Sequence, residues 1–406
     1  MPDPYVSVVV TAYNRRRYLP EALRSLERQT LDKGRFEVVV VKNFEDPASD
    51  EIIRRNGWKN VVADVRALGG MVAVGVEESR GEVVTFLDDD DMYAPERLQV
   101  VKRAFEETRD LVYFHNGQVV VDEGGNAIPS AVAAAPLSAD VVVGDRAKRV
   151  PCSLDYLRVL AKADFNMSSI AVRRDLLGPR ELETLRALPY SPDSYLYAAA
   201  FAVEGAMYLT PSRLTLYRVH RSNVSALLSP PLAMEHLREG RLRDLREQVR
   251  AARLAGMAMR LESLPPIYEI ARANCGPLNS YLLDYLRMRF EQILYSPGPP
   301  AAGRSSLLEL LRAAALYEYL KARHRKLAAS AAGLAGALLA GGPGAAGAAA
   351  GRSKRPLPRL GVLFWAPFRG VAYYLLQYAP EGLKGRVLDL LLLRELLWNL
   401  RAARGR

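Results

Sequence analysis

The chain has 406 residues, of which 50% are hydrophobic and 25% charged, so it can bury more than one core and is not a disordered tail. Its formal net charge is +11, and the basic excess lies in residues 226–406, which hold 27 basic and 13 acidic residues. A nucleic-acid enzyme would carry its positive charge around the active cleft, so the separate basic half favours an anionic surface, and no nucleic acid, as partner. Cys152 and Cys275 stand alone, without a CxxC pair, which excludes a disulfide scaffold or a thiolate zinc site.

Short β-branched runs alternate with helical stretches in the first half of the chain. The runs at 6–10, 36–41 and 83–87 are nearly continuous in Val, Leu and Phe, as buried parallel strands are, and 19–27 and 96–107 have helical patterns. This alternation predicts an α/β fold with an open, mostly parallel sheet and helices on both faces. Ligands of such sheets bind at the carboxyl ends of the strands, so the residues that follow each run are the candidates for a site.

The second half changes to Leu-, Ala- and Arg-rich segments and predicts an all-helical region. We expect helices at about 232–263, 278–296 and 305–329, separated by prolines. The uncharged stretch 327–351 is long enough to span a bilayer, but it is mostly Ala and Gly and has basic residues on both sides. A re-entrant or flexible segment therefore fits better than a single span, which stays the alternative.

Apolar and aromatic clusters lie among basic residues beyond this stretch. They are typical of amphipathic helices in a headgroup region that meets anionic lipid, although a helical domain that packs on itself or on a twin is the alternative. We therefore divide the chain into a catalytic domain (1–225), a helical domain (226–330) and an Ala/Gly-rich segment with basic amphipathic helices (331–406). The predicted location is the cytoplasm, peripheral on the inner face of the cell membrane.

Four consecutive aspartates, residues 88–91, end the apolar run 83–87. Adjacent carboxylates repel one another, so their place at the end of a buried strand calls for a cation. Mn²⁺ or Mg²⁺ is the natural guest, because these ions prefer oxygen ligands and are held by one or two carboxylates together with substrate phosphates. The alternative is an acidic surface turn.

Taken together, the motifs of residues 4–225 resemble the family-2 glycosyltransferases of the GT-A fold, in the order and spacing of that family. The matching segments are 6–14 (VSVVVTAYN), 18–26 (YLPEALRSL), 29–30 (QT), 86–91 (FLDDDD) and 216–225 (LYRVHRSNVS). The resemblance implies a Rossmann-like catalytic domain and transfer of a sugar, with inversion, from a nucleoside diphosphate sugar.

The resemblance also implies roles for particular residues on the donor side. Thr11 and Tyr13 would line the nucleotide pocket, and the alternative for both is ordinary strand-end packing. Asp88 and Asp90 match the two acids of the family's DxD motif and would bind the metal, with Asp89 close to the ribose or sugar. The next acid of the run, Asp91, would face the acceptor.

Two further residues are implied on the acceptor and diphosphate sides. Asp193, in the segment 190–196 (YSPDSYL), matches the family's acidic motif and would be the general base, although Asp is also a favoured helix N-cap. His220 would approach the diphosphate or the metal, and the alternative is a polar core residue. His115 could face the acceptor, but a structural role is the stronger interpretation.

The chain departs from the family pattern at two places. Lys42-Asn43-Phe44 stands where relatives have two aspartates, and Met71-Val72-Ala73 stands in place of an Ala-Arg-Asn triplet. Asn43 can still accept a hydrogen bond from a nucleotide base, and we consider that Lys42 supplies positive charge to the diphosphate.

The main interpretation is a metal-dependent inverting glycosyltransferase, with a UDP-sugar as the favoured donor and a hydroxyl or phosphate acceptor such as a lipid-linked glycan. The alternative is a catalytically inactive nucleotide-sugar or glycan-binding scaffold of the same fold. A nucleotidyltransferase is disfavoured, because the basic segment 14–17 has no glycine for a triphosphate loop.

Overall fold

The computed structural model describes residues 5–128, 139–149, 153–220, 242–295 and 308–322, together with the single residues 137 and 372. The strands are β1 (Val6–Ala12), β2 (Phe36–Lys42), β3 (Lys59–Val62), β4 (Val83–Asp88), β5 (Met92–Tyr93), β6 (Leu111–Val121), β7 (Val141–Val143), β8 (Ile170–Arg173) and β9 (Ala206–Arg218). The helices are α1 (Leu19–Glu27), α2 (Pro47–Arg55), α3 (Leu68–Glu77), α4 (Arg97–Glu107), α5 (Asp145–Lys148), α6 (Ser153–Ala161), α7 (Pro179–Ala187), α8 (Pro192–Ala202), α10 (Leu242–Cys275) and α11 (Ser280–Tyr295).

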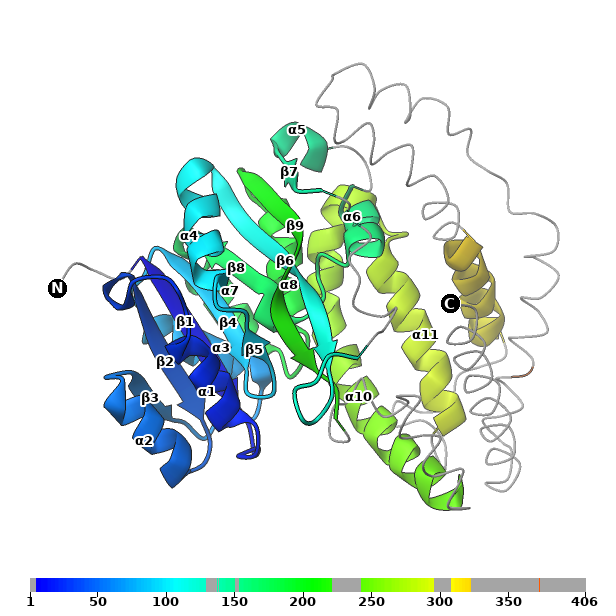
Figure 1. Ribbon diagram of the computed structural model, residues 1–406. Coiled ribbons are helices and arrows are strands. Elements are labelled where there is room, and N and C mark those ends of the chain that lie inside the picture. Colours follow the sequence, from blue (N-terminus) through cyan, green and yellow to red (C-terminus); the bar gives the residue numbers. More distant parts are fainter. Residues whose placement is uncertain are drawn as a thin grey trace. The chain divides into compact units, whose positions relative to one another are not determined.

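One mixed sheet organises the N-terminal part of the chain (Figure 1), in the order β3-β2-β1-β4-β8-β6-β9-β5, with β7 paired to β9. The four strands from β3 to β4 are parallel. The apolar runs predicted β1, β2 and β4, whereas the mostly exposed β3 was not predicted. The other half is mixed, because β8 pairs antiparallel with both of its neighbours whereas β6 and β9 run parallel. The α/β fold class is confirmed, and the parallel character belongs mainly to the first half of the sheet.

The alternation of side chains along β1 divides the core between the two faces of the sheet. Val6, Val8 and Val10 pack with buried residues of α1, α2 and α4 on one face. On the other face Val39 and Val41 of β2 pack against Met71 of α3. Since every residue of β1 is buried, both faces of this strand are covered, which explains its unbroken apolar sequence.

The chain divides into two compact units. The described part of the first comprises residues up to Arg218 and residues 262–279, and that of the second comprises 219–220, 242–261, 280–295, 308–322 and the single residue 372. In the first unit Asn274 accepts the Leu154 N–H at 3.1 Å, and Ser263 Oγ accepts the Tyr190 N–H at 3.0 Å. These bonds attach the second part of α10 to the loops around α6 and α8.

The described C-terminal region is helical, as predicted, over α10, α11 and residues 308–322. One expectation was wrong, because α10 continues through Pro265 and Pro266 instead of ending at 263. Buried Leu264, Ile267 and Ala271 anchor this part of the helix, so packing outweighs the backbone hydrogen bonds that the prolines remove.

The Ala/Gly-rich stretch 327–351 and the amphipathic helices expected beyond it lie outside the described residues. Over the ranges that are described, no helix combines the length and the apolar character needed to cross a membrane.

Candidate active site

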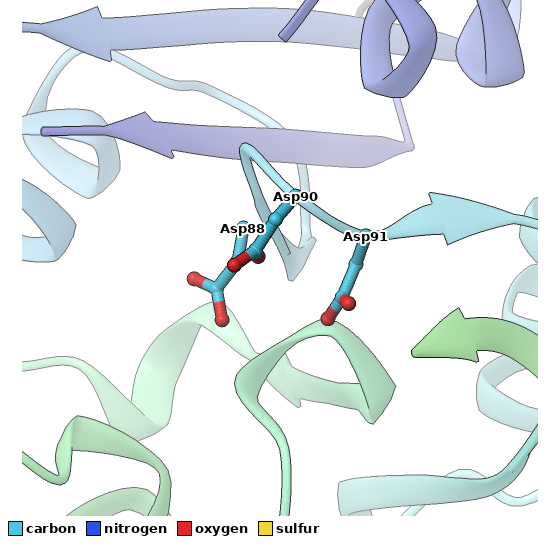
Figure 2. A group of neighbouring side chains, drawn as sticks. All are labelled: Asp88, Asp90 and Asp91. Carbon is cyan, nitrogen blue, oxygen red and sulfur yellow. The ribbon is translucent and has the colours of Figure 1, made fainter. Parts of the chain in front are cut away.

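The aspartate run forms the loop that leaves the carboxyl end of β4, beside the ends of β1 and β2. Asp88 is paired with Thr11 of β1, and Ala12 is paired with Lys42 of β2, so the ends of the three strands meet at one edge of the sheet. Figure 2 shows Asp88, Asp90 and Asp91 projecting to the same side of this loop. Each offers one carboxylate oxygen, and these oxygens all lie within 4.8 Å of one another.

Burial sets the electrostatics of this carboxylate cluster, which we define as Asp88, Asp90 and Asp91. Burial, with repulsion from Asp90 as the next cause, raises the pKa of Asp88 well above its ordinary value and that of Asp91 to about 7. The same causes raise the pKa of the neighbouring Asp89 to about 8. Such repulsion is relieved by a bound cation, and hard carboxylate oxygens are the ligands that Mg²⁺ and Mn²⁺ prefer. The donor set therefore fits a divalent metal.

The segment 166–168, which precedes β8, forms hydrogen bonds with the loop that carries the aspartate run. Asn166 Nδ2 donates to Asp91 Oδ2 at 2.8 Å, and Ser168 Oγ accepts the Asp88 N–H at 3.0 Å. Asn166 has φ of +70°, a left-handed conformation that Asn tolerates better than most residues. Asp91 is 1% exposed, and its other oxygen accepts the Arg218 N–H at 2.9 Å. Both oxygens of Asp91 thus accept hydrogen bonds from the protein itself, and its predicted position facing the acceptor stays a prediction.

Arg218, at the end of β9, is a structural cation that the motif analysis did not assign. Its side chain is fully buried and donates to the carbonyl oxygens of Asp90 at 2.9 Å and Glu123 at 2.7 Å, and to the carboxylate of Glu21 at 2.6 Å. A guanidinium carries five donors, so it can fix several loops at once. Its place in the segment 216–225 was the available signal, but only the fold shows which carbonyls it reaches.

Arg15 supplies the cation that directly contacts the aspartate run. Its Nη1 lies 2.6 Å from Asp90 Oδ2, and its Nε and Nη2 both donate to Asp89, the former at 3.2 Å. The Asp89 side chain is 3% exposed and that of Arg15 is 32% exposed. In this structure Asp89 thus engages Arg15, and its predicted contact with the ribose or sugar stays a prediction.

Two asparagines clasp the loop that follows β1. The Asn14 N–H donates to Asn43 Oδ1, and Asn43 Nδ2 donates to Asn14 Oδ1, both at 2.9 Å. Asn14 has φ of +55°, so the clasp holds the loop in a left-handed turn. Asn43 thus lies at the predicted edge but already uses its amide within the protein.

The other donor-side residues lie at the same strand ends. Thr11 Oγ1 donates to Asp88 Oδ1 at 3.2 Å, and Tyr13 packs against the cluster of Val39, Val41 and Met71. Lys42 has no exposed surface and contacts Asp50 at 2.9 Å and the Phe44 carbonyl oxygen at 2.7 Å. This contradicts the hypothesis that Lys42 supplies positive charge to the diphosphate, because its ammonium group binds Asp50 of α2 and the carbonyl oxygen of Phe44.

Asp193 lies in the first turn of α8, one residue after Pro192, and Ser191 is the N-cap. The N-cap alternative was therefore wrong, and Asp193 Oδ1 instead accepts the adjacent Ser194 N–H at 2.8 Å. The loop before α8 is bonded to the start of α3, since the Gly69 N–H donates to the Leu188 carbonyl at 3.1 Å. The predicted role of Asp193 as the general base stays a prediction.

The two histidines differ in how far the structure defines them. His115 is 3% exposed, its Nε2 lies 2.8 Å from the Phe165 carbonyl oxygen, and burial lowers its pKa to about 4, which indicates a structural role. His220 is buried and follows the first unit, and its predicted contact with the diphosphate or metal stays a prediction.

Comparisons with known proteins find similar glycosyltransferases. Residues 7–176 match the family model described as "Glycosyl transferase family 2". The chain is similar to "Uncharacterized glycosyltransferase MJ1057" of Methanocaldococcus jannaschii, with 30% identity over 32% of the chain and 46% of that protein. It is also similar to "Undecaprenyl-phosphate 4-deoxy-4-formamido-L-arabinose transferase" of Pseudomonas aeruginosa, with 38% identity over 25% of the chain and 33% of that protein.

The chain thus spans less than half the length of each of these two relatives. Among solved structures, S. aureus TarS 1-349 aligns over 80% of this chain and 89% of its own, with 17% identity and a TM-score of 0.42.

Proposed function

Residues 7–176 belong to glycosyl transferase family 2, as the motifs predicted, and from this premise we propose that the protein is a metal-dependent, inverting glycosyltransferase. It would move a sugar from a nucleoside diphosphate sugar, with a UDP-sugar as the favoured donor, to a hydroxyl or phosphate acceptor. The observation that carries the proposal is the carboxylate cluster, whose ligand oxygens lie within 4.8 Å of one another at the carboxyl end of β4.

Asp88 and Asp90 are the residues that would hold the metal. Asp91 would not need to bind the metal directly, because its oxygens already accept hydrogen bonds from Asn166 and Arg218, which fix the loop that carries Asp88 and Asp90. A bound Mn²⁺ or Mg²⁺ supplies a Lewis acid that stabilises the negative charge of the leaving diphosphate. On the protein's side, Thr11 donates to Asp88 and thereby orients that carboxylate.

Asp193 would act as the general base. Its carboxylate takes the proton of the acceptor hydroxyl while the acceptor oxygen bonds to the anomeric carbon and the bond from that carbon to the diphosphate oxygen breaks. A single attack from the face opposite the leaving group inverts the configuration without a covalent intermediate. The start of α8 is held in place by Ser194 Oγ, which donates to Asp164 at 3.2 Å, and Asp164 pairs with Arg158 at 2.6 Å.

We further propose that Tyr13 and Asn43 bind the nucleotide base. Tyr13 is partly buried beside Met71, and Asn43 ends the neighbouring strand, so both lie at the edge where β1 and β2 finish. The amide oxygen of Asn43 accepts the Asn14 N–H and keeps a second lone pair for a base N–H.

For the acceptor we propose a lipid-linked glycan at an anionic membrane surface. The basic excess of residues 226–406 supports this, as does the similarity to a protein named as an undecaprenyl-phosphate transferase. Flotation of the full chain with vesicles that contain anionic lipid, but not with neutral vesicles, is the expected result. Equal recovery with both kinds of vesicle would remove the membrane from the proposal.

The test of the enzyme is turnover of a panel of UDP-, GDP- and dTDP-sugars by the purified full chain with Mn²⁺ or Mg²⁺. Asp90→Asn and Asp193→Asn are each expected to abolish the turnover of one donor, and chelation should do the same. Asp175→Asn is the matched control, because Asp175 is an exposed aspartate. It lies two residues beyond Arg173, which pairs with Val83 at the start of β4, whereas the aspartate run follows the end of β4. Binding of a nucleotide sugar without turnover, even with membrane extract as acceptor, would favour the inactive scaffold.

A further inference from the structure

The guanidinium of Arg15 forms an ion pair with Asp90, one of the two carboxylates that are proposed to bind the metal. Arg15 Nη1 lies 2.6 Å from Asp90 Oδ2, and a guanidinium is not deprotonated in proteins. The side chain is therefore a permanent positive charge at the carboxylate cluster. A divalent cation that approaches Asp90 meets this charge at close range and is repelled by it.

Arg15 is anchored to a residue outside the carboxylate cluster, and this anchor allows it to release Asp90. Two of its nitrogens, Nε and Nη2, donate to Asp89, and Nη1 lies 2.6 Å from Asp90 Oδ2. Asp89 itself is fixed, because its N–H donates to the Thr11 carbonyl at 3.1 Å and its side chain is almost fully buried. A rotation of the guanidinium can thus break the Asp90 contact and keep the Asp89 contacts.

The backbone that carries Arg15 is pinned, while its side chain remains partly open to solvent. The clasp of Asn14 with Asn43 fixes the residue immediately before Arg15. The Arg15 side chain is 32% exposed, so it can reorient without opening the core. The Arg15 side chain thus leaves a loop that is held at Asn14, and it is itself partly accessible to solvent.

We propose that Arg15 is a built-in counter-cation for the metal site, which must leave Asp90 before a divalent cation binds there and which thereby sets the metal affinity. This inference rests on the proposed function, since it takes Asp88 and Asp90 as the metal ligands. The role is one of control over the site and does not place Arg15 among the reacting groups.

The experiment is a titration of the full chain with Mn²⁺ in the absence of nucleotide, followed by the loss of the electron paramagnetic resonance signal of free Mn²⁺. Arg15→Met is expected to bind Mn²⁺ about tenfold more tightly than the unmodified chain, or ~1.4 kcal/mol, which is in the range of one charge-assisted hydrogen bond. Arg15→Lys should fall between the two, because one ammonium group cannot bridge Asp89 and Asp90 as the guanidinium does.

Arg16→Met is the matched control, since it removes the same charge from the same loop. Arg16 is exposed, and its Nε donates to the Glu45 carbonyl at 3.2 Å, away from the aspartate run. Its Mn²⁺ affinity should match that of the unmodified chain, and Asp90→Asn should abolish the binding. Circular dichroism of each variant shows that it is folded.

The possible results separate this inference from the proposed function. Unchanged or weaker Mn²⁺ binding by Arg15→Met, with binding by the unmodified chain intact, overturns the role of Arg15 and leaves the metal site standing. A gain of equal size in Arg16→Met would reduce the effect to net charge and overturn the inference as well. Absence of Mn²⁺ binding in every variant overturns both the metal site and the control by Arg15.

Discussion

Replacing Gly69 by alanine tests the contact that joins the start of α3 to the loop before the proposed base. A Cβ at position 69 would overlap the carbonyl oxygen of Leu185 and lie 3.0 Å from both Cβ and the carbonyl oxygen of Leu188. Two of these three atoms belong to the backbone, so no rotation of a flexible side chain can relieve the overlap. Leu185 lies in the last turn of α7 and Leu188 follows that helix, so this segment or the start of α3 has to shift, and we expect the shift to reach the first turn of α8.

The expected magnitude follows from two opposing effects. Alanine is favoured over glycine in a helix by about 1 kcal/mol, so propensity alone predicts that Gly69→Ala is stabilising. Overpacking costs about 1–3 kcal/mol or more, and a clash with backbone belongs to the upper end of that range. We expect a net loss of about 2 kcal/mol, which lowers the melting temperature by ~4–8 °C for a unit of this size.

The consequence for activity is larger than the loss of stability. A displacement of about 1 Å in a reacting group lowers turnover by ~10²-fold, and Asp193 lies in the turn that would shift. The assays are thermal melting and donor turnover, with Gly144→Ala as the matched control. Gly144 has φ of −79° and nothing within 4 Å of the position of an added Cβ, so its replacement should change stability by less than about 1 kcal/mol.

Equal or greater stability of Gly69→Ala relative to Gly144→Ala would refute the close contact between α3 and the 185–188 segment. A stability loss with unchanged turnover would instead show that the contact does not position Asp193.

Three other outcomes are expected. Burial lowers the pKa of His115 to about 4 from its ordinary 6.5, so between these pH values the unfolded chain binds a proton that the folded chain does not. The free energy of unfolding therefore falls by about 3 kcal/mol as the pH drops from 6.5 to 4. His115→Gln should flatten this part of a series of urea-unfolding measurements against pH, and an unchanged slope would contradict the assignment to His115. Gln29→Ala removes the side-chain acceptor of the buried Leu98 N–H, which is bonded at 3.0 Å, and should cost about 1–3 kcal/mol by denaturant unfolding; a neutral result would show that water replaces the amide. Asn166→Ala and Asn166→Gly both remove the amide of Asn166, but a φ of +70° is strained for alanine and not for glycine. The glycine variant should therefore be more stable by about 1 kcal/mol in thermal melting. The reverse order would argue against the left-handed backbone at this residue.

The sequence by itself determined the fold class and the place of the candidate site. Parallel strands buried on both faces require continuous apolar runs, and such runs are visible without a structure, as in β1, β2 and β4. The aspartates at 88–91 follow one of these runs, and the carboxyl ends of parallel strands gather at one edge. These features are local along the chain, so composition and spacing are sufficient to predict them.

Only the tertiary structure decided which charges meet at the site. Arg15 is 74 residues from Asp89, and Arg218 is more than a hundred residues from the aspartate loop, so no local pattern indicates that either contacts it. The sequence identifies Lys42 as a free positive charge, whereas the fold buries it against Asp50 and leaves Arg15 as the cation at the cluster. The four aspartates look equivalent in the sequence but differ in the fold. Asp91 accepts hydrogen bonds from Asn166 and Arg218, and Asp89 accepts them from Arg15. The physical reason is that hydrogen bonds and ion pairs depend on positions in space to within about 1 Å, and the packing of distant segments alone sets those positions.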